Sequence, residues 1–384
     1  MDHGMRAKEL IAALVAAVAC LVAAPRAGAE PYLMVRAGAK CLDCHVNKTG
    51  GGKRTAFAHI HSKDILHDLD LLPIPSGVKA FNGEISQYLS VGSDLRVRET
   101  LTWNERQSAE VRNDQVARHH LQSNDLSVIE ALVYGQVDLW PDIVTLYVDE
   151  NLNGGATNRE AFGMIHGVLP WQGWIKAGRM FPTYGLRLYE DSSFVRSKTG
   201  FTFVGSDEGV EFGAAPGPLQ LATSVTNGSS GDKEVQVTWN GYTLLEDVPV
   251  VRTVLVGASA ARFSNRRHVE GAYAGTNWWK LTGLVEFDNI TDNTPQDFST
   301  TARKSQYAAY AELNCLLLDW LNLRGTFDFV KVAGDRDAVR YTVGAEPFVN
   351  KYLQPRILFR INNGPTSQPE LNTNELWLEM HFFL

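Results

Sequence analysis

The chain of 384 residues contains few cysteines, no strong excess of positive charge and few long hydrophobic runs. Its 4 cysteines are too few for the dense disulfide framework of small secreted domains. A net charge of −7 and an isoelectric point near 5.8 argue against nucleic-acid binding. No nucleophile elbow, phosphate loop or dinucleotide fingerprint occurs either. These absences exclude the commonest soluble enzyme classes that can be recognised by motif.

The one long apolar run lies at the N-terminus and predicts an export signal. Arg6 and Lys8 precede it, the run covers residues 10–24, and the small residues Ala27–Ala29 follow it. A membrane anchor is the alternative, but the run is about 15 residues and a spanning helix needs roughly 20. We therefore expect a signal peptide that is cleaved before Glu30 and an exported mature chain.

Two cysteines and a histidine stand together shortly after the expected cleavage site. Cys41, Cys44 and His45 form a C-x-x-C-H motif, the pattern of covalent c-type haem attachment. Composition alone predicts only about 0.001 such motifs in a chain of this kind. A disulfide or a thioredoxin-like pair is the alternative, but no βαβ pattern surrounds the motif. We expect one haem c, bound through Cys41 and Cys44, with His45 as the proximal iron ligand.

The second axial ligand remains open in the sequence. Three histidines follow the motif, and His61 is the first candidate, ahead of His59 and His67. His59 and His61 are two residues apart and face the same way in an extended segment. Each could also be an ordinary solvated histidine, and Met34 is the alternative sulfur ligand.

The stretch between the motif and these histidines is rich in glycine and basic residues. Gly50–Gly52 allow the backbone to lie close to a macrocycle or to turn sharply away from it. Lys48, Lys53 and Arg54 could neutralise haem propionates or simply be solvated.

The remainder of the chain shows the two-residue alternation of β-strands. Leu281–Asp288 and Val235–Trp239 alternate in this way, and we count about sixteen such segments. Turn sequences such as Asn240-Gly241 stand at segment ends. The predicted organisation is a signal peptide (1–29), a monohaem c-type cytochrome segment with linker (30–82) and a β-domain (83–384).

Alternation fits either a soluble sandwich or propeller, or a transmembrane barrel with a polar lumen. Charged residues recur at the polar positions, and the chain ends on the strand 376–384, whose apolar face would invite aggregation if it were a soluble edge. Tryptophans gather near segment ends, as in interfacial girdles: Trp103, Trp140, Trp171, Trp174, Trp278, Trp279, Trp320 and Trp377. We therefore predict an all-β protein, a transmembrane antiparallel barrel of about 16 strands preceded by the small haem-binding segment.

Connection lengths predict an orientation. Short turns alternate with longer polar loops, which we place at 104–123, 149–160, 186–207, 289–304 and 363–373. Long loops of such barrels face outward and short turns face the periplasm. The haem segment is then expected on the periplasmic side or inside the lumen.

In this arrangement the chain resembles the fused monohaem cytochrome–porins of bacterial outer membranes, which include outer-membrane iron oxidases. The stretches "CLDCHVNKTGGG" (41–52) and "LPWQGWIKAGRMFPTYG" (169–185) also resemble uncharacterised outer-membrane proteins of metal-respiring bacteria. The Phe-Pro and Gly-Phe-Lys pattern that follows the motif in the iron oxidases is absent here, so the resemblance does not extend to iron oxidation itself.

The resemblance implies an electron carrier of the outer membrane rather than an enzyme; if catalytic, it would oxidise or reduce a metal. Implied partners are periplasmic c-type cytochromes, outer-membrane lipid and an extracellular metal or multihaem cytochrome. One haem cannot bridge a membrane about 30 Å thick unless partners approach it from both faces. Two alternatives remain: a general porin with a haem plug or sensor, and the barrel of a porin–cytochrome complex whose electrons pass through multihaem partners.

Overall fold

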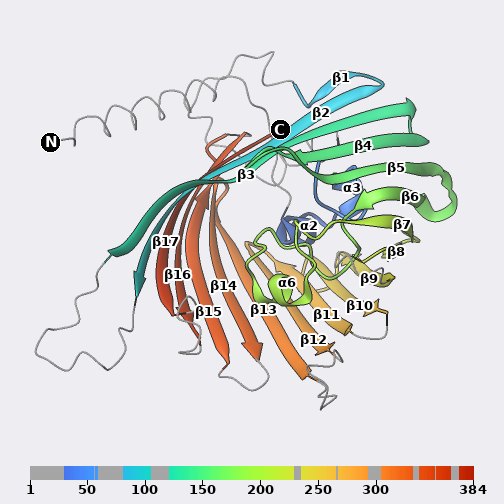
Figure 1. The fold of residues 1–384 in the computed structure, drawn as a ribbon. Coiled ribbons are helices and arrows are strands. Elements are labelled where there is room, and N and C mark those ends of the chain that lie inside the picture. The colour runs from blue at the N-terminus through green and yellow to red at the C-terminus, as the bar shows by residue number, and fades with distance from the viewer. Residues whose placement is uncertain are drawn as a thin grey trace, which may run out of the picture.

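The computed structural model is a closed antiparallel β-barrel of sixteen strands, β2 to β17 (Figure 1). It describes residues 30–55, 57–58, 81–104, 121–228, 235–264, 267–292, 304–331, 337–350, 352–364 and 372–384. Consecutive strands pair along the whole sheet, and β17 pairs with β2 from Thr373↔Asn104 to Phe383↔Asp94. The final strand therefore has no free edge, as its apolar face predicted. Within the described residues, no helix has the length and apolarity of a membrane-spanning helix.

The strands are as follows: β1 (Glu84–Ser86), β2 (Leu89–Asn104), β3 (Leu121–Trp140), β4 (Val144–Asn151), β5 (Thr157–Leu169), β6 (Gly173–Met180), β7 (Asp207–Ala214), β8 (Leu219–Thr226), β9 (Gln236–Glu246), β10 (Thr253–Phe263), β11 (Arg267–Trp278), β12 (Leu281–Asp292), β13 (Lys304–Leu318), β14 (Leu321–Lys331), β15 (Ala338–Pro347), β16 (Leu353–Asn363) and β17 (Thr373–Phe383). The three-residue β1 pairs only with the start of β2. The prediction of an all-β barrel with about sixteen strands is confirmed.

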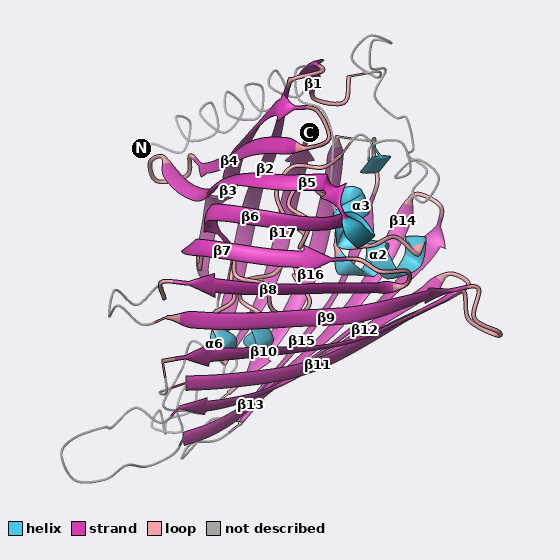
Figure 2. Ribbon diagram, turned by 90° about the vertical axis from the view of Figure 1, so that its right-hand side faces the viewer, coloured by secondary structure: helices cyan, strands magenta, loops and turns pink. Residues whose placement is uncertain are grey.

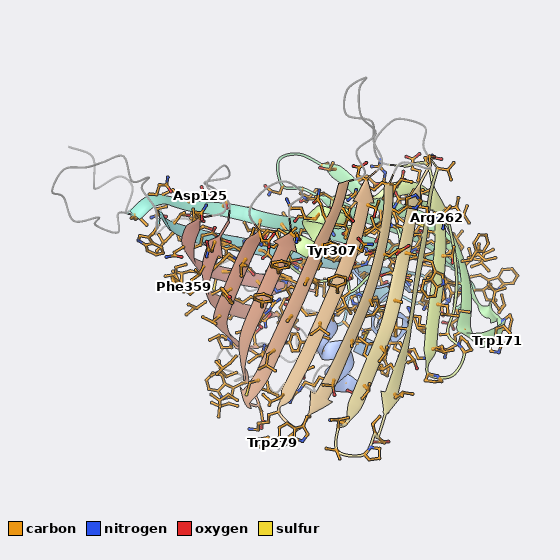
Figure 3. The ribbon with its side chains drawn as sticks, turned by 90° about the horizontal axis from the view of Figure 1, so that it is seen from below. Asp125, Trp171, Arg262, Trp279, Tyr307 and Phe359 are labelled. Atoms are coloured by element: carbon orange, nitrogen blue, oxygen red, sulfur yellow. The ribbon has the colours of Figure 1, made fainter. Side chains whose placement is uncertain are left out.

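The barrel turns its apolar side chains outward and its polar side chains inward. On β12, Val285 and Phe287 are 50% and 49% exposed, whereas Glu286 and Asp288 are 3% and 0% exposed. Tyr307 and Phe359 point away from the barrel wall in the same manner (Figure 3). This pattern is the reverse of a soluble β-protein and is typical of a lipid-facing exterior.

Exposed tryptophans mark one end of the barrel, where the short turns lie. Trp140, Trp171, Trp278 and Trp279 are exposed there, and Figure 3 shows Trp171 and Trp279 at the end opposite Arg262.

Two tryptophans assigned to the girdles from the sequence lie elsewhere. Trp174 is 1% exposed and donates to Glu211 inside the lumen. Trp377 is also buried and stacks under the guanidinium of Arg98. Both face inward because the alternation of their strands places them among the lumen-facing residues.

Two chain segments fill the lumen (Figures 1 and 2). The first, residues 30–55 with 57–58, is called the plug; it contains α2 (Pro31–Ala37) and α3 (Cys41–Cys44). The second, residues 181–206 between β6 and β7, is called the inserted segment and contains α6 (Phe194–Thr199). The plug helices lie towards the short-turn end and α6 towards the other end (Figure 2).

The expectation that the loop at 186–207 faces outward is therefore wrong. Its apolar side chains explain the difference, because Leu188, Phe194 and Val195 are buried in a core shared with Tyr32 and Val35 of the plug. Burying such side chains in the lumen is favourable, whereas an outer loop would leave them in water.

Candidate functional site

The C-x-x-C-H motif lies at the start of a small loop inside the barrel. Cys41–Cys44 make one helical turn, α3, whose start is capped because the backbone N–H of Lys40 donates to Asp43 at 2.8 Å. The chain then doubles back, and His45 pairs with Arg54 in an antiparallel bridge. The bridge fixes His45 and Arg54 side by side, nine residues apart in sequence.

The glycine run makes this turn possible and brings the plug against the barrel wall. Gly51 and Gly52 have φ of +83° and +65°, which side-chain-bearing residues adopt only with strain. A Cβ at Gly52 would lie 2.2 Å from the hydroxyl of Tyr147 on β4. That hydroxyl instead accepts a hydrogen bond from the backbone N–H of Lys53 at 2.9 Å. The backbone therefore approaches the wall more closely than any side chain would permit.

A buried polar cluster holds the loop to the wall on another side. Asn47 is 0% exposed; its amide donates to Glu160 at 2.8 Å and accepts from Lys176 at 2.9 Å. Lys176 in turn pairs with Glu211 at 2.9 Å. The amide group of Asn47 therefore has a hydrogen-bond partner for both its nitrogen, the carboxylate of Glu160, and its oxygen, the ammonium of Lys176. These bonds hold the loop in place without leaving the buried amide unpaired.

Cys41 is anchored to the same wall. Its backbone N–H donates to the Tyr242 hydroxyl on β9 at 3.1 Å, and that hydroxyl donates to Gln220 on β8 at 2.7 Å. Gln220 completes the link by donating to the carbonyl of Lys48 at 2.9 Å. The backbone of the motif is therefore positioned by strands and not only by its own short helix.

The motif borders a cavity of about 540 Å³ between plug and wall. Its lining includes Cys41, Cys44, His45 and Met34 of the plug. The two motif cysteines are free thiols, and the sulfur of Cys41 lies 3.6 Å from that of Met34. A volume of this size is typical of sites that hold a small organic ligand or cofactor.

Burial sets the protonation of the motif. His45 is 8% exposed, and desolvation, with the positive charge of Arg54, lowers the pKa of His45 to about 3. The imidazole is therefore neutral at physiological pH, which is the form that binds a metal ion. Its Nδ1 is buried without a hydrogen-bond partner among the described residues. Burial also raises the pKa of Cys44 to about 11.

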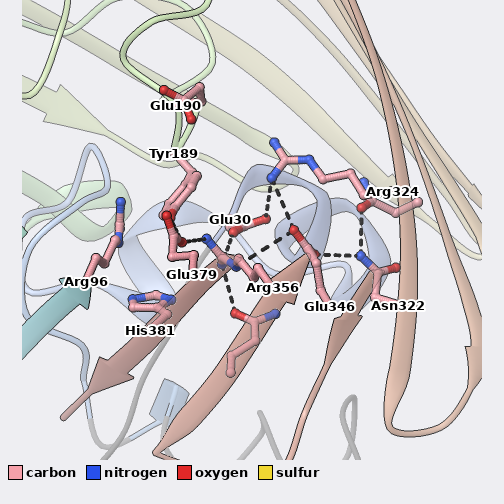
Figure 4. A network of polar contacts seen from close by, with 12 residues as sticks. Glu30, Arg96, Tyr189, Glu190, Asn322, Arg324, Glu346, Arg356, Glu379 and His381 are labelled. Carbon is pink, nitrogen blue, oxygen red and sulfur yellow. Dashed lines mark hydrogen bonds and ion pairs between the residues drawn. The ribbon is translucent and has the colours of Figure 1, made fainter. Parts of the chain in front are cut away.

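The start of the plug is held by an ionic network on the opposite wall (Figure 4). Glu30 is 6% exposed and contacts Arg356 on β16 and, at 3.7 Å, Arg324 on β14. These arginines also pair with Glu346 and Glu379. Burial alone would raise the pKa of Glu30, but Arg356 and Arg324 hold this pKa below its usual value. The carboxylate is therefore ionised and anchors the plug.

The inserted segment closes the lumen on the other side of the cavity. Tyr184 donates to Asp288 on β12 at 2.7 Å, and the N–H of Phe194 donates to Asp328 on β14 at 3.1 Å. Leu186 and Arg187 of this segment line the cavity together with the plug. The cavity is thus bordered by three parts of the chain that are distant in sequence: the plug, the inserted segment and the barrel wall.

Comparisons with known proteins agree with this architecture. No protein-family model and no curated protein matches the chain. Solved outer-membrane proteins do match, each over 77% of this chain. OmpT of Vibrio cholerae lacking loop L8 matches with a TM-score of 0.54 at 9% identity and is covered over 99% of its own length, and OmpF of Salmonella typhi in complex with daunomycin matches with a TM-score of 0.55 at 11% identity over 97% of its length. The anion-selective porin from Comamonas acidovorans matches with a TM-score of 0.51 at 10% identity over 99% of its length. The chain has a porin-like fold. At these sequence identities the likeness concerns the fold alone: it shows a porin-like barrel and does not extend to a ligand or substrate.

The fold brings together some of the residues that the sequence predicted to bind haem. Cys41, Cys44 and His45 border one cavity in the lumen, and Met34 joins them. His59 and His61, the candidate distal ligands, lie outside the described residues, as does His67. Among the described residues no group of three or more His, Cys, Asp or Glu side chains is arranged for a metal ion.

Sequence reasoning missed Arg187. It stands 142 positions after His45, in a segment expected to face outward, and carries no motif. Only the inward fold of the inserted segment reveals it.

Proposed function

We propose that this protein is an outer-membrane, porin-like barrel that carries one covalent haem c in its lumen. It would transfer single electrons between a periplasmic c-type cytochrome and a donor or acceptor outside the cell, a metal or a multihaem cytochrome. One observation carries the proposal: Cys41, Cys44 and His45 of the C-x-x-C-H motif line the same cavity. The apolar exterior and the porin-like fold support the location in the outer membrane.

The residues around the cavity fit this cofactor. Cys41 and Cys44 are not joined in a disulfide, so both sulfurs are available for thioether bonds. His45 is neutral and buried, as a proximal ligand must be. Haem bound here would supply one-electron chemistry.

The chain's own contribution is to hold the ligands and exclude water. The bridge between His45 and Arg54 sets the position of the imidazole, and the Tyr242 hydroxyl sets that of Cys41. The inserted segment covers the cavity from the other side. For the sixth iron ligand we propose His61, with His59 as the next candidate; Met34 is the alternative because its thioether borders the cavity.

The cavity lies near the short-turn end, which we assign to the periplasm. Its lining includes Arg252 and Asp319 from two short turns, and Arg36 of the plug donates to the carbonyl of Lys280 in a third. A periplasmic cytochrome could approach this end closely. An outside partner would have to reach into the barrel from the loop end, since one haem does not span about 30 Å of membrane.

A general porin with a haem plug or sensor is the second candidate. The likeness to porins, among them an anion-selective one, favours it. The plug and the inserted segment both occupy the lumen, which weighs against free diffusion of solutes. The barrel of a porin–cytochrome complex remains a third possibility, in which separate multihaem proteins carry the main electron path.

The test is haem attachment in a host that expresses the c-type haem machinery. We expect the wild-type protein to give a haem-stained band in a denaturing gel, because thioether bonds survive denaturation. Cys41→Ala combined with Cys44→Ala should abolish the band, whereas Cys315→Ala on β13 should leave it unchanged. An unstained wild type, or a stained double variant, would refute the proposal.

A further inference from the structure

Two arginines, the buried Arg54 and the half-buried Arg187, face the cavity without an ion pair among the described residues. Arg54 is 6% exposed, and its position beside His45 is fixed by backbone hydrogen bonds of 3.0 Å from Val46 to Lys53 and from Thr55 to Cys44. Its side chain lines the main cavity and a smaller adjoining space of about 60 Å³. Within the described part of the chain, its guanidinium makes no ion pair.

Arg187 reaches the same two spaces from the inserted segment. Its guanidinium lies 5.4 Å from the ring centre of Phe181 and 5.9 Å from that of Phe203. It also donates a long hydrogen bond of 3.4 Å to the carbonyl of Pro182. Gly51 packs against its side chain, since a Cβ there would lie 3.3 Å from Cδ. Like Arg54, it has no ion pair among the residues described.

Several other arginines of the lumen form ion pairs. Arg356 pairs with Glu30 and Glu379, and Arg324 pairs with Glu312 at 3.0 Å. A buried cation without a counter-charge costs several kcal/mol. Acidic groups such as Asp94 near Arg54 and Glu160 near Arg187 act only from beyond ion-pair distance. Two cations on one cavity without a direct ion pair therefore indicate that an anionic ligand belongs there.

We propose that Arg54 and Arg187 bind the two propionate carboxylates of the haem attached at Cys41 and Cys44. This inference rests on the proposed function and assigns the orientation of its cofactor. Guanidinium groups pair with carboxylates in a bidentate manner, and two carboxylates match two unpaired cations. Arg187 would then tie the inserted segment to the plug through the cofactor, so haem attachment would also fix the closed lumen.

The experiment measures the haem midpoint potential of the intact, haem-loaded protein in detergent at pH 8. We expect Arg54→Gln and Arg187→Gln each to lower the potential, because a propionate that loses its cation favours the oxidised, more positive haem. Arg54→Lys and Arg187→Lys keep the charge and should stay closer to wild type. Arg267→Gln is the matched control, since Arg267 binds the inserted segment through the carbonyl of Lys198 but does not line the cavity.

Heat-modifiable gel mobility checks that each variant forms a folded barrel. Potentials of both Gln variants equal to that of wild type, in protein that stains for haem, would overturn the arginine assignment and leave the proposed function intact. A wild-type protein without covalent haem would instead overturn the proposed function and this inference with it. If Gln and Lys variants shift the potential equally, the effect is structural and the assignment also fails.

Discussion

At the scale of single residues, the lumen changes the chemistry of the motif. Burial leaves His45 neutral and raises the pKa of Cys44 to about 11, so the folded protein offers a good metal ligand but a poorly ionised thiol. Thioether formation is therefore favoured before the barrel closes around residues 41–45, when the thiols are still in water. The position of the motif early in the chain fits this order.

The proposed distal iron ligand, His61, can be tested by spectroscopy of single-residue variants. We expect His61→Ala to convert a six-coordinate low-spin haem into a high-spin species, because a second imidazole would be lost. His67→Ala serves as the control and should leave the low-spin spectrum intact. If Met34→Ala abolishes a sulfur-to-iron charge-transfer band while His61→Ala has no effect, Met34 is the ligand and the assignment of His61 is wrong.

At the scale of elements, the loop from Cys44 to Thr55 is the part that places the site. Its two arms are joined by the bridge between His45 and Arg54, and its glycines lie against Tyr147 and the inserted segment. Such a loop has no regular secondary structure to stabilise it. It depends on contacts with β4, β5, β6 and β8, so the barrel wall acts as its scaffold.

Gly52→Ala should loosen this loop. The left-handed backbone costs a residue with a Cβ about 1–2 kcal/mol, and the contact with the Tyr147 hydroxyl adds to that cost. We expect amide hydrogen exchange of residues 44–55 to accelerate roughly 5- to 30-fold.

Gly154→Ala is the matched control for this prediction. Gly154 also has a positive φ, of +76°, but a Cβ there would have no neighbour within 4 Å. We expect Gly154→Ala to change amide hydrogen exchange only in the loop after β4. Unchanged exchange of residues 44–55 in Gly52→Ala would show that the close approach to Tyr147 does not hold the loop.

At the scale of the whole molecule, the plug and the inserted segment occupy the lumen, which in an open pore is filled with water. Plug and inserted segment share one apolar core and bind the wall through charged groups such as Glu30 and Asp328. The barrel ladder itself is complete without them, because β2 to β17 pair with one another around the whole circumference. The barrel and its filling are therefore separable in principle.

Deleting residues 30–58 while keeping residues 1–29 should open the lumen. We expect the truncated barrel to show a clearly higher single-channel conductance in planar bilayers than the intact protein, because polar strand faces would then border water. The intact protein in the same bilayers is the reference. Equal conductance of the two would mean that the inserted segment alone closes the pore, or that the intact lumen already conducts.

The sequence by itself determined the barrel and the identity of the motif residues. Alternation with a period of two and a terminal apolar strand are local properties, and strands 281–292 and 373–383 form where these patterns predicted. The C-x-x-C-H motif is equally local, since three residues within five positions define it. Such features can be read from neighbours in the chain.

The tertiary structure alone decided what fills the lumen. Whether a long loop points outward or inward depends on space inside the barrel and on partners far away in sequence, as the contact of Phe194 with Asp328 shows. The inward positions of Trp174 and Trp377 follow from strand register, which a one-residue shift would reverse. For the same reason Arg187 could not be recognised beforehand: its role depends on its proximity to Gly51 and the cavity, and closing the barrel creates both.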